Sequence, residues 1–275
     1  MKECYRLGAE KFGWSRRNPT PGSMRAPDGA CVGWGMATAT YPANRFPNQA
    51  RIRLMLDRDG GVRAIGAAAT QDLGTGAYTV FTQMTAMLVG LPFERVKFEL
   101  GDSNLPPGGV SGGSASTAGV GQALSEAAGK LREALLKRAQ EDSESPLAGL
   151  GPDQVVFQGG RIVAGDDPTR GVDLSDLLKG GPAYVEGLSD ANPAAADNFP
   201  AKKKAHTFQS FGAHFVEVAV DERLPIVRVT RVVSVMDVGR VINPKTAGSQ
   251  VQGGVIMGIG QALLEDCLLY TSRCV

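Results

Sequence analysis

Three glycine-rich segments combine hydroxyl, amide and cationic groups in patterns that could hold a phosphate. The first is Gln71–Thr79, in which a Gly74-Thr75-Gly76 turn comes directly before a predicted helix. Backbone N–H groups at such a turn point toward an anion, and the helix dipole helps to hold it. The same turn is also common as a plain connection between a strand and a helix, so this segment alone decides nothing.

The second segment, Ser111–Thr117, opens a long predicted helix. Its free amides and hydroxyls form a possible phosphate cradle. Hydroxyls at this position could also serve simply as helix N-caps. Capping requires only one or two of these residues and does not account for the adjacent Gly112 and Gly113, so both interpretations stay open.

The third segment is a loop together with the first turns of the last predicted helix. Two residues there offer cationic donors, Arg240 and Lys245. Neutral hydrogen-bonding groups follow at Asn243, Thr246 and Gln250. Cations and amides on one loop are typical of a site that binds a phosphorylated ligand.

Glycines also occur inside that last helix, at Gly253, Gly254, Gly258 and Gly260. Each costs about 0.8–1 kcal/mol relative to alanine in a helix interior. We therefore expect close packing of another element against this helix to offset roughly 3–4 kcal/mol. Tight helix–helix contact would explain these glycines without any ligand.

Other familiar chemistry is not indicated. The sequence contains no Walker motif, no GxGxxG after a strand, no HExxH and no GxSxG. Two histidines and four cysteines, none of them in a CxxC pair, do not assemble a convincing zinc site. We therefore assign no catalytic and no metal-ligating side chain.

Composition excludes two classes of partner. The 275 residues carry a formal net charge of +1, which gives no long-range field for nucleic acid or an anionic membrane. The short basic run Lys202–Lys204 is best interpreted as a solvated loop. No stretch reaches the roughly 18–20 apolar residues that a membrane span needs. We expect a soluble protein.

Hydrophobic periodicity predicts the secondary structure. Helices are expected at residues 1–13, Thr79–Leu91, Ser116–Gln140, after an Asp173 cap, and after Pro244. Strands are expected at Cys31–Tyr41, Arg51–Asp57, Val62–Thr70, Val96–Leu100, Val155–Phe157, Arg161–Val163, His214–Asp221 and Ile226–Met236. Because helices and strands alternate without a regular βαβ order, we expect an α+β fold with mixed sheets, in one domain over residues 1–266.

Several of these patterns together resemble the molybdopterin-binding large subunits of the xanthine dehydrogenase/aldehyde oxidase family. The similarity is greatest to the three-subunit aldehyde oxidoreductases of bacteria, and it covers residues 1–266 in order. The segments that carry it are Gly8–Trp14, Gly33–Ala37, Gln71–Gly76, Ser111–Ser114, Gly239–Thr246 and Ser249–Glu265.

The resemblance implies that the chain binds molybdenum through molybdopterin cytosine dinucleotide. The segment around Thr75 would line the pterin and molybdenum end, and the segment around Ser114 would hold the dinucleotide. The loop around Lys245 would hold phosphates and pterin from another side. The implied cofactor-binding residues are Leu73, Gly74, Thr75, Gly113, Ser114, Arg240, Val241, Ile242, Asn243, Pro244, Lys245, Thr246 and Gln250.

The resemblance also implies water-dependent oxidation of an aldehyde or a nitrogen heterocycle. Electrons would pass to a 2Fe-2S subunit and an FAD-binding subunit, in the cytoplasm or the periplasm. The family's catalytic glutamate lies in a Gly-x-Gly-Glu motif beyond the position of Glu265, and Glu265 itself is not that base. Since Cys267–Val275 does not fit the family pattern, we expect an inactive internal fragment with an aberrant tail.

Two other hypotheses stay open. A non-catalytic protein could use the same cradles for a nucleotide or another phosphorylated metabolite. A purely structural module would use Gly113 and Gln250 only for folding.

Overall fold

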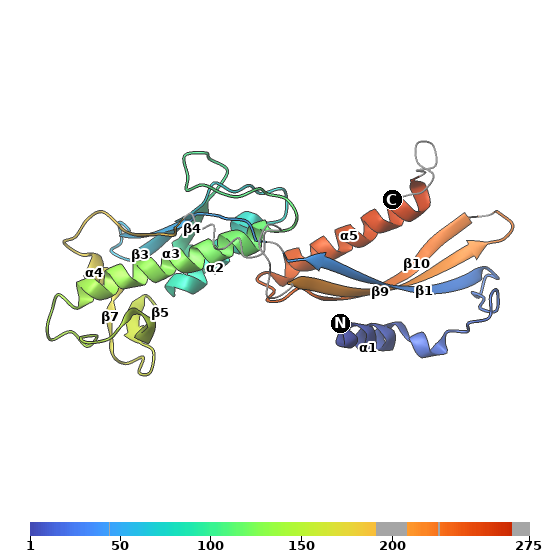
Figure 1. Cartoon of the computed structure of the whole chain (residues 1–275), viewed down its shortest axis with the longest axis horizontal. Coiled ribbons are helices and arrows are strands. Elements are labelled where there is room, and N and C mark those ends of the chain that lie inside the picture. Colours follow the sequence, from blue (N-terminus) through green and yellow to red (C-terminus); the bar gives the residue numbers. More distant parts are fainter. Residues whose placement is uncertain (44, 191–207, 225, 266–275) are drawn as a thin grey trace. The chain divides into compact units, whose positions relative to one another are not determined.

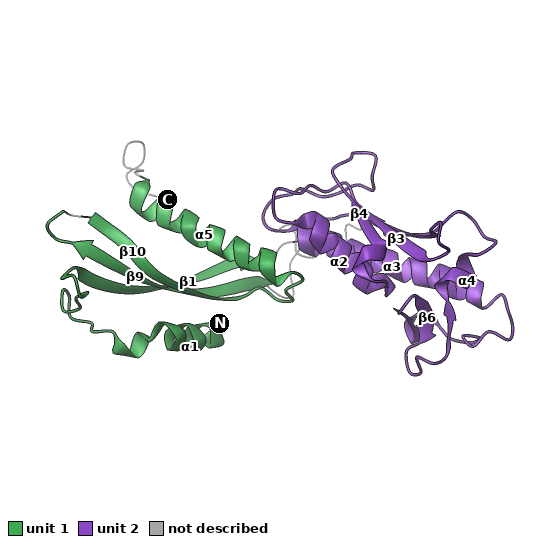
Figure 2. Cartoon of the chain, turned by 180° about the vertical axis from the view of Figure 1, so that it is seen from behind, with its two compact units in different colours: residues 1–42, 208–275 green, residues 43–207 purple. Residues whose placement is uncertain are grey.

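The chain divides into two compact units (Figure 2). Unit 1 comprises Met1–Pro42 and Phe208–Val275, and unit 2 comprises Ala43–Thr207. The computed structural model describes residues 1–43, 45–190, 208–224 and 226–265. Two predicted features lie outside these ranges, the lysine run Lys202–Lys204 and the tail from residue 267.

Unit 1 is built on a three-stranded antiparallel sheet in the order β1-β9-β10 (Figure 1). Its strands are β1 (Cys31–Pro42), β9 (Gln209–Asp221) and β10 (Ile226–Asp237). The last two predicted strands pair with each other antiparallel, and β9 begins five residues earlier than expected. A bulge between Val229 and Arg231 shifts the register, which increases the local twist.

Helix α1 (Lys2–Phe12) packs on one face of this sheet. Gly8 makes the close approach possible, because a Cβ there would stand 2.3 Å from the ring of Phe215. The helix ends at Gly13, whose left-handed conformation (φ 77°) lets its N–H bond back to the last turn. A 3-10 turn, η1 (Trp14–Arg16), follows. The buried residues of this core are Cys4, Phe12, Ala213 and Phe215.

Helix α5 (Pro244–Leu264) lies on the opposite side of the sheet from α1 (Figure 1). It begins at Pro244 itself, one residue before the predicted start, and none of its residues is buried. The expected close packing at its four glycines is wrong for the described residues, because no described atom of another element lies within 4 Å of the position of an added Cβ. Among the described residues, no helix combines the length and the apolarity that crossing a bilayer requires.

Unit 2 contains a four-stranded mixed sheet in the order β4-β3-β2-β8. Strand β2 pairs antiparallel with β3 and with β8, whereas β3 and β4 run parallel. The β2–β3 hairpin turns at Gly60 (φ 77°), as the Asp-Gly-Gly sequence predicts. The strands are β2 (Arg51–Leu56), β3 (Val62–Ala67), β4 (Val96–Glu99) and β8 (Val185–Leu188).

Two helices cover one face of this sheet, α2 (Ala77–Val89) and α3 (Ser116–Ala139). Their approach depends on small residues: a Cβ at Gly66 would meet Thr85 Oγ1 at 2.6 Å, and one at Gly187 would meet the Ala127 carbonyl oxygen at 2.0 Å. The side chains of Ile52, Leu54, Phe81, Leu124, Leu131 and Leu135 are fully buried there. The predicted α+β fold with mixed sheets is confirmed.

A second sheet of unit 2 contains β5 (Val155–Gln158), β6 (Arg161–Ala164) and β7 (Gly171–Asp173). Helix α4 (Leu174–Leu178) follows directly. Asp173 occupies the N-cap position of α4 as predicted, but its side chain makes no capping hydrogen bond. The carboxylate instead lies 3.4 Å from Arg161 Nε. Two further 3-10 turns are η2 (Phe93–Arg95) and η3 (Pro152–Gln154).

Candidate functional site

The first predicted segment folds around the carboxylate of Asp72. Its Oδ1 accepts hydrogen bonds from the amides of Gly74 (2.9 Å) and Gly76 (3.2 Å). Its Oδ2 accepts a longer one from the amide of Tyr78 (3.4 Å). These amides were predicted to face a bound anion, and the structure instead uses them to hold the loop. What the loop presents to solvent is the exposed Leu73 and Thr75.

The second segment is a tight turn with strained backbone. Gly113 (φ 59°) and Ser114 (φ 56°) are both left-handed, and the Ala115 amide donates to the Gly112 carbonyl oxygen at 3.3 Å. Ser114 is the one non-glycine residue with positive φ in the part of the chain that the structure describes. This conformation costs a non-glycine residue roughly 1–2 kcal/mol.

Helix α3 starts immediately after this turn, and no side chain caps its first turn. The simple interpretation of the serines and threonine as N-caps is therefore wrong. The first amides of a 24-residue helix are left for another partner, at the positive end of its dipole. Ser114 and Thr117 are exposed on this end.

The structure brings these two segments together within unit 2. Ser111 Oγ donates a hydrogen bond to Gln71 Oε1. The stretches of chain just before the two segments are also hydrogen-bonded to each other: the Ala69 amide donates to the Pro106 carbonyl oxygen at 2.7 Å. A Cβ at Gly108 would stand 2.2 Å from the Ala69 carbonyl oxygen, so only glycine permits this approach. Leu73–Thr75 and Gly113–Ser114 thus lie on adjoining loops.

The third segment lies in unit 1 and is organised by its own helix cap. Asn243 Oδ1 accepts from the amides of Lys245 (3.1 Å) and Thr246 (3.2 Å). The Thr246 hydroxyl donates to the Asn243 carbonyl oxygen at 3.3 Å. Arg240, Lys245 and Gln250 are exposed. Because this segment belongs to the other unit, its convergence with the first two on one ligand stays a prediction.

Comparison with known proteins identifies the family. Residues 7–273 match the family model described as the molybdopterin cofactor-binding domain. This chain belongs to that family. It is 37% identical over 269 residues to the aldehyde oxidoreductase molybdenum-binding subunit PaoC of Escherichia coli strain K12, which covers 96% of this chain and 33% of PaoC.

Two other known proteins match over similar ranges of this chain. The putative xanthine dehydrogenase molybdenum-binding subunit XdhA of E. coli K12 is 29% identical over 279 residues, 98% of this chain and 35% of XdhA. The structure of quinoline 2-oxidoreductase from Pseudomonas putida 86 shares the fold, with a TM-score of 0.68 at 18% identity, over 96% of this chain and 34% of that one. The chain thus spans about one third of the length of the curated relatives it matches.

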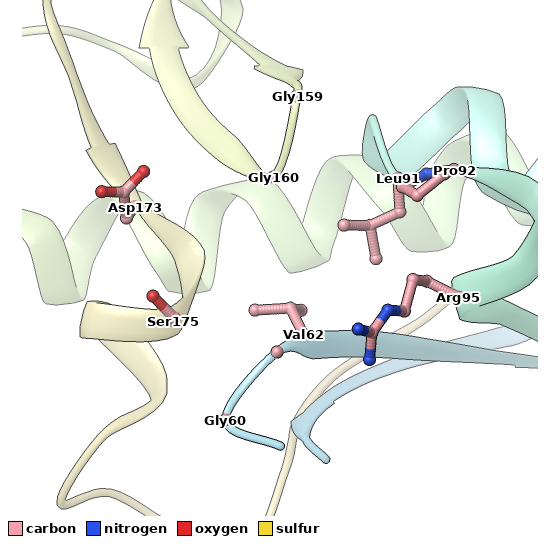
Figure 3. Close-up of a pocket in the computed structure, with 10 residues that line it drawn as sticks. Gly60, Val62, Leu91, Pro92, Arg95, Gly159, Gly160, Asp173 and Ser175 are labelled. Atoms are coloured by element: carbon pink, nitrogen blue, oxygen red, sulfur yellow. The ribbon is translucent and has the colours of Figure 1, made fainter. Parts of the chain in front are cut away.

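A cavity of about 300 Å³ in unit 2 is separate from the predicted cofactor loops (Figure 3). Leu91 and Arg95 lie on one side of it, facing Asp173 and Ser175 on the other. It adjoins the C-terminal end of α2, whereas the Leu73–Thr75 loop precedes the N-terminal end. Since α2 has 13 residues, a distance of about 20 Å separates the two ends.

The main cation of this cavity is already neutralised. Arg95 Nη2 donates to Asp59 Oδ2 at 2.6 Å, and Nη1 donates to Oδ1 at 3.2 Å. Hydrogen bonds from Arg95 and from the Gly61 amide lower the pKa of Asp59 to about 2. The cavity therefore offers no free charge for a phosphate. Within the described ranges, no group of three or more His, Cys, Asp or Glu side chains could hold a metal ion.

Two positions at the candidate site were missed from the sequence. Asp72 was not assigned as the acceptor that orders the first loop, although an Asp two residues before a Gly is a known signal for such a turn. No pattern in the sequence indicated a role for Asn48. Its Oδ1 accepts from the Gly109 amide at 2.7 Å, which joins a segment distant in the sequence to the loop before Ser111.

Proposed function

We propose that this chain holds molybdopterin cytosine dinucleotide in the large subunit of an enzyme that oxidises aldehydes or nitrogen heterocycles with water. Support comes from the 37% identity to a molybdenum-binding subunit over 96% of this chain. The whole relative is about three times longer, so the reaction belongs to the complete subunit together with its partners.

The observation that carries the proposal is the Gly112–Ala115 turn. It holds Ser114 in a strained conformation and leaves the first turn of α3 without a side-chain cap. Strain of this kind is maintained where it serves a function, and uncapped helix amides bind phosphate. The donor chemistry of the turn fits the dinucleotide phosphates of the proposed cofactor.

The neighbouring residues would bind and orient the same ligand. Asp72 fixes the loop that presents Leu73 and Thr75, so that loop is preorganised. Lys245, at the start of α5, would add a cation toward the phosphates. When bound, the molybdenum cofactor supplies the oxidation chemistry, and this chain supplies no catalytic side chain. Electrons would leave through 2Fe-2S and FAD-binding subunits.

The test is to express the complete reading frame with its maturation partners. We expect close to one molybdenum per large subunit by mass spectrometry, and release of CMP on acid hydrolysis. Absence of both from the purified, folded complex would overturn the proposal. Stabilisation by a nucleotide without any molybdenum would favour a non-catalytic binding protein.

A matched pair of variants tests the turn itself. Gly113→Ala places a Cβ at φ 59°, whereas Gly149→Ala does so at φ 77° in an exposed loop of the same unit. Each change strains the backbone by roughly 1–2 kcal/mol. We expect Gly113→Ala to lower molybdenum content several-fold, and Gly149→Ala to leave it unchanged. Equal molybdenum content in the two variants would contradict a role for the turn in binding.

A further inference from the structure

One buried side chain, that of Asn48 (8% exposed), contacts the chain on both sides of the strained turn at Gly113 and Ser114. Before the turn, Asn48 Oδ1 accepts a hydrogen bond from the Gly109 amide at 2.7 Å. Asn48 Nδ2 donates to the Phe46 carbonyl oxygen at 2.8 Å. Because a carbonyl oxygen only accepts and a backbone N–H only donates, these two partners fix which way the side-chain amide points.

After the turn, the same side chain packs against the first turn of α3. A Cβ at Gly119 would stand 2.3 Å from Asn48 Nδ2 and 2.9 Å from the Phe46 carbonyl oxygen, which excludes any larger residue there. A Cβ at Gly109 would stand 2.9 Å from the Pro47 carbonyl oxygen. Both ends of the stretch from Gly109 to Gly119 therefore lie against one short segment, and the strained turn lies between them.

The segment that carries Asn48 is itself fixed to the four-stranded sheet. The Ala50 amide donates to Ser189 Oγ at 2.9 Å, and Gln49 Nε2 donates to the Ser189 carbonyl oxygen at 2.8 Å. The Gln49 amide also donates to the Pro107 carbonyl oxygen at 2.8 Å. Ala50 leads directly into β2. Asn48 thus connects the turn to a hydrogen-bonded sheet.

We propose that Asn48 is a positioning residue, which sets where the amides of the Gly112–Ala115 turn and of the start of α3 lie. Through them it determines how tightly the phosphates of the cofactor are held. The inference rests on the proposed function, because it needs a ligand at the turn. The oxygen and the nitrogen of the Asn48 amide are bonded within the chain, so the residue acts through the turn. Donors already in place before a ligand arrives lose less conformational freedom when it binds.

The experiment compares two buried side chains in the complete subunit, coexpressed with its partner subunits and maturation partners. Asn48→Ala removes the contact with the chain around the turn. Ser189→Ala removes the acceptor of the Ala50 amide, on the sheet side of the same segment, and leaves the bond to Gly109 in place. Each variant leaves a buried amide unpaired, so both should lower the urea midpoint. We expect the molybdenum content of the folded subunit to fall several-fold in Asn48→Ala and to stay at the wild-type level in Ser189→Ala. Equal molybdenum contents in the two variants would overturn the proposal.

Two variants of nearly the same shape separate positioning from the filling of space. Asn48→Asp fits beside Gly119 and keeps an oxygen that accepts from the Gly109 amide, although it loses the donor to the Phe46 carbonyl oxygen. Asn48→Leu fills a similar volume and makes neither hydrogen bond. We expect Asn48→Asp to recover most of the molybdenum content that Asn48→Ala loses, and Asn48→Leu to recover little. A molybdenum content in Asn48→Leu equal to or above that in Asn48→Asp would show that the side chain only fills space, and would overturn the proposal.

Molybdenum content of the wild-type complex separates the two questions. A folded wild-type complex without molybdenum would contradict the proposed function, whatever the variants show. A loaded wild-type complex with equally loaded Asn48 variants would contradict only the positioning by Asn48.

Discussion

The two long helices of the molecule, α3 in unit 2 and α5 in unit 1, relate differently to their surroundings. Eleven residues of α3 are buried, whereas none of the 21 residues of α5 is. Glycines show the same contrast. A Cβ at Gly119 or Gly121 of α3 would stand 2.3–2.4 Å from a side-chain atom outside the helix, and one at Gly253 of α5 would meet nothing within 4 Å.

A more polar sequence in α5 does not explain why α5 is exposed and α3 is buried. Helix α5 is the more apolar of the two, and it exposes Ile256 (69%) and Met257 (74%). A helix that is apolar on all sides is normally enclosed by other elements. The comparison teaches that unit 2 completes its core from its own residues, whereas the described part of unit 1 completes only the core beneath α1.

The largest expected effect tests this contrast directly. Leu131→Ala removes a fully buried side chain from α3, which should lower the free energy of unfolding by about 2–5 kcal/mol. Ile256→Ala in α5 should change it by less than about 0.5 kcal/mol. Urea denaturation of the 275-residue chain measures both. Similar losses in the two variants would show that α5 is covered in solution.

A second prediction asks whether unit 1 is well packed on its α1 side. Glu217 accepts hydrogen bonds from Thr230 Oγ1 (2.8 Å), Trp34 Nε1 (2.8 Å) and Arg231 Nη2 (3.1 Å). Burial raises the pKa of Glu217, but these hydrogen bonds outweigh it and hold the pKa below its ordinary value of 4.5. Glu217→Gln should therefore cost about 1.5–3 kcal/mol at pH 7.

The sign of the pH dependence follows from the lowered pKa of Glu217. Its stabilising effect is complete above the ordinary pKa of 4.5 that applies in the unfolded chain, and it disappears as the pH falls through the lower folded pKa. The difference between wild type and Glu217→Gln should thus shrink below about pH 4. Glu3→Gln, at an exposed helix pair, serves as the control with a small effect. A difference that stayed constant down to pH 2 would contradict this assignment.

The third prediction compares glycines of the two helices. Gly119→Ala in α3 meets Asn48 Nδ2 and the Phe46 carbonyl oxygen, so it should destabilise the chain by about 1–2 kcal/mol. Gly253→Ala has open space and gains helix propensity, so it should stabilise the chain by about 0.5–1 kcal/mol. Effects of opposite sign in urea denaturation are expected. Destabilisation by Gly253→Ala would mean that a close contact exists there.

The smallest expected effect concerns the start of α3. Ser114→Gly relieves about 1–2 kcal/mol of backbone strain and increases the entropy of the unfolded chain by about 0.4–1 kcal/mol. A net gain of about 0.5–1 kcal/mol is expected in thermal or urea unfolding. If the proposed function holds, molybdenum content of the complete subunit falls in the same variant. A variant that is both more stable and fully loaded would contradict a functional reason for the strain.

Much of the secondary structure could be predicted because its causes are local. The alternation in Arg51–Leu56, the apolar stripe of Ser116–Ala139 and the Asn-Pro start of α5 act over a few residues. Strand β8 (Val185–Leu188) was missed, since four residues carry little pattern. It is a strand because β2, more than 130 residues earlier, supplies its hydrogen bonds.

At the candidate site, too, some features could be predicted from the sequence and others depend on the tertiary structure. The sequence by itself determined which segments hold glycines, hydroxyls and cations, and hence which chemistry they suit. Tertiary structure decided how those groups are used: Asp72 takes the amides of the first loop, Gln71 joins it to Ser111, and Ser114 is forced into a left-handed turn. The physical reason is that a residue's type fixes what it can donate or accept, whereas folding alone fixes which partner lies within hydrogen-bonding distance.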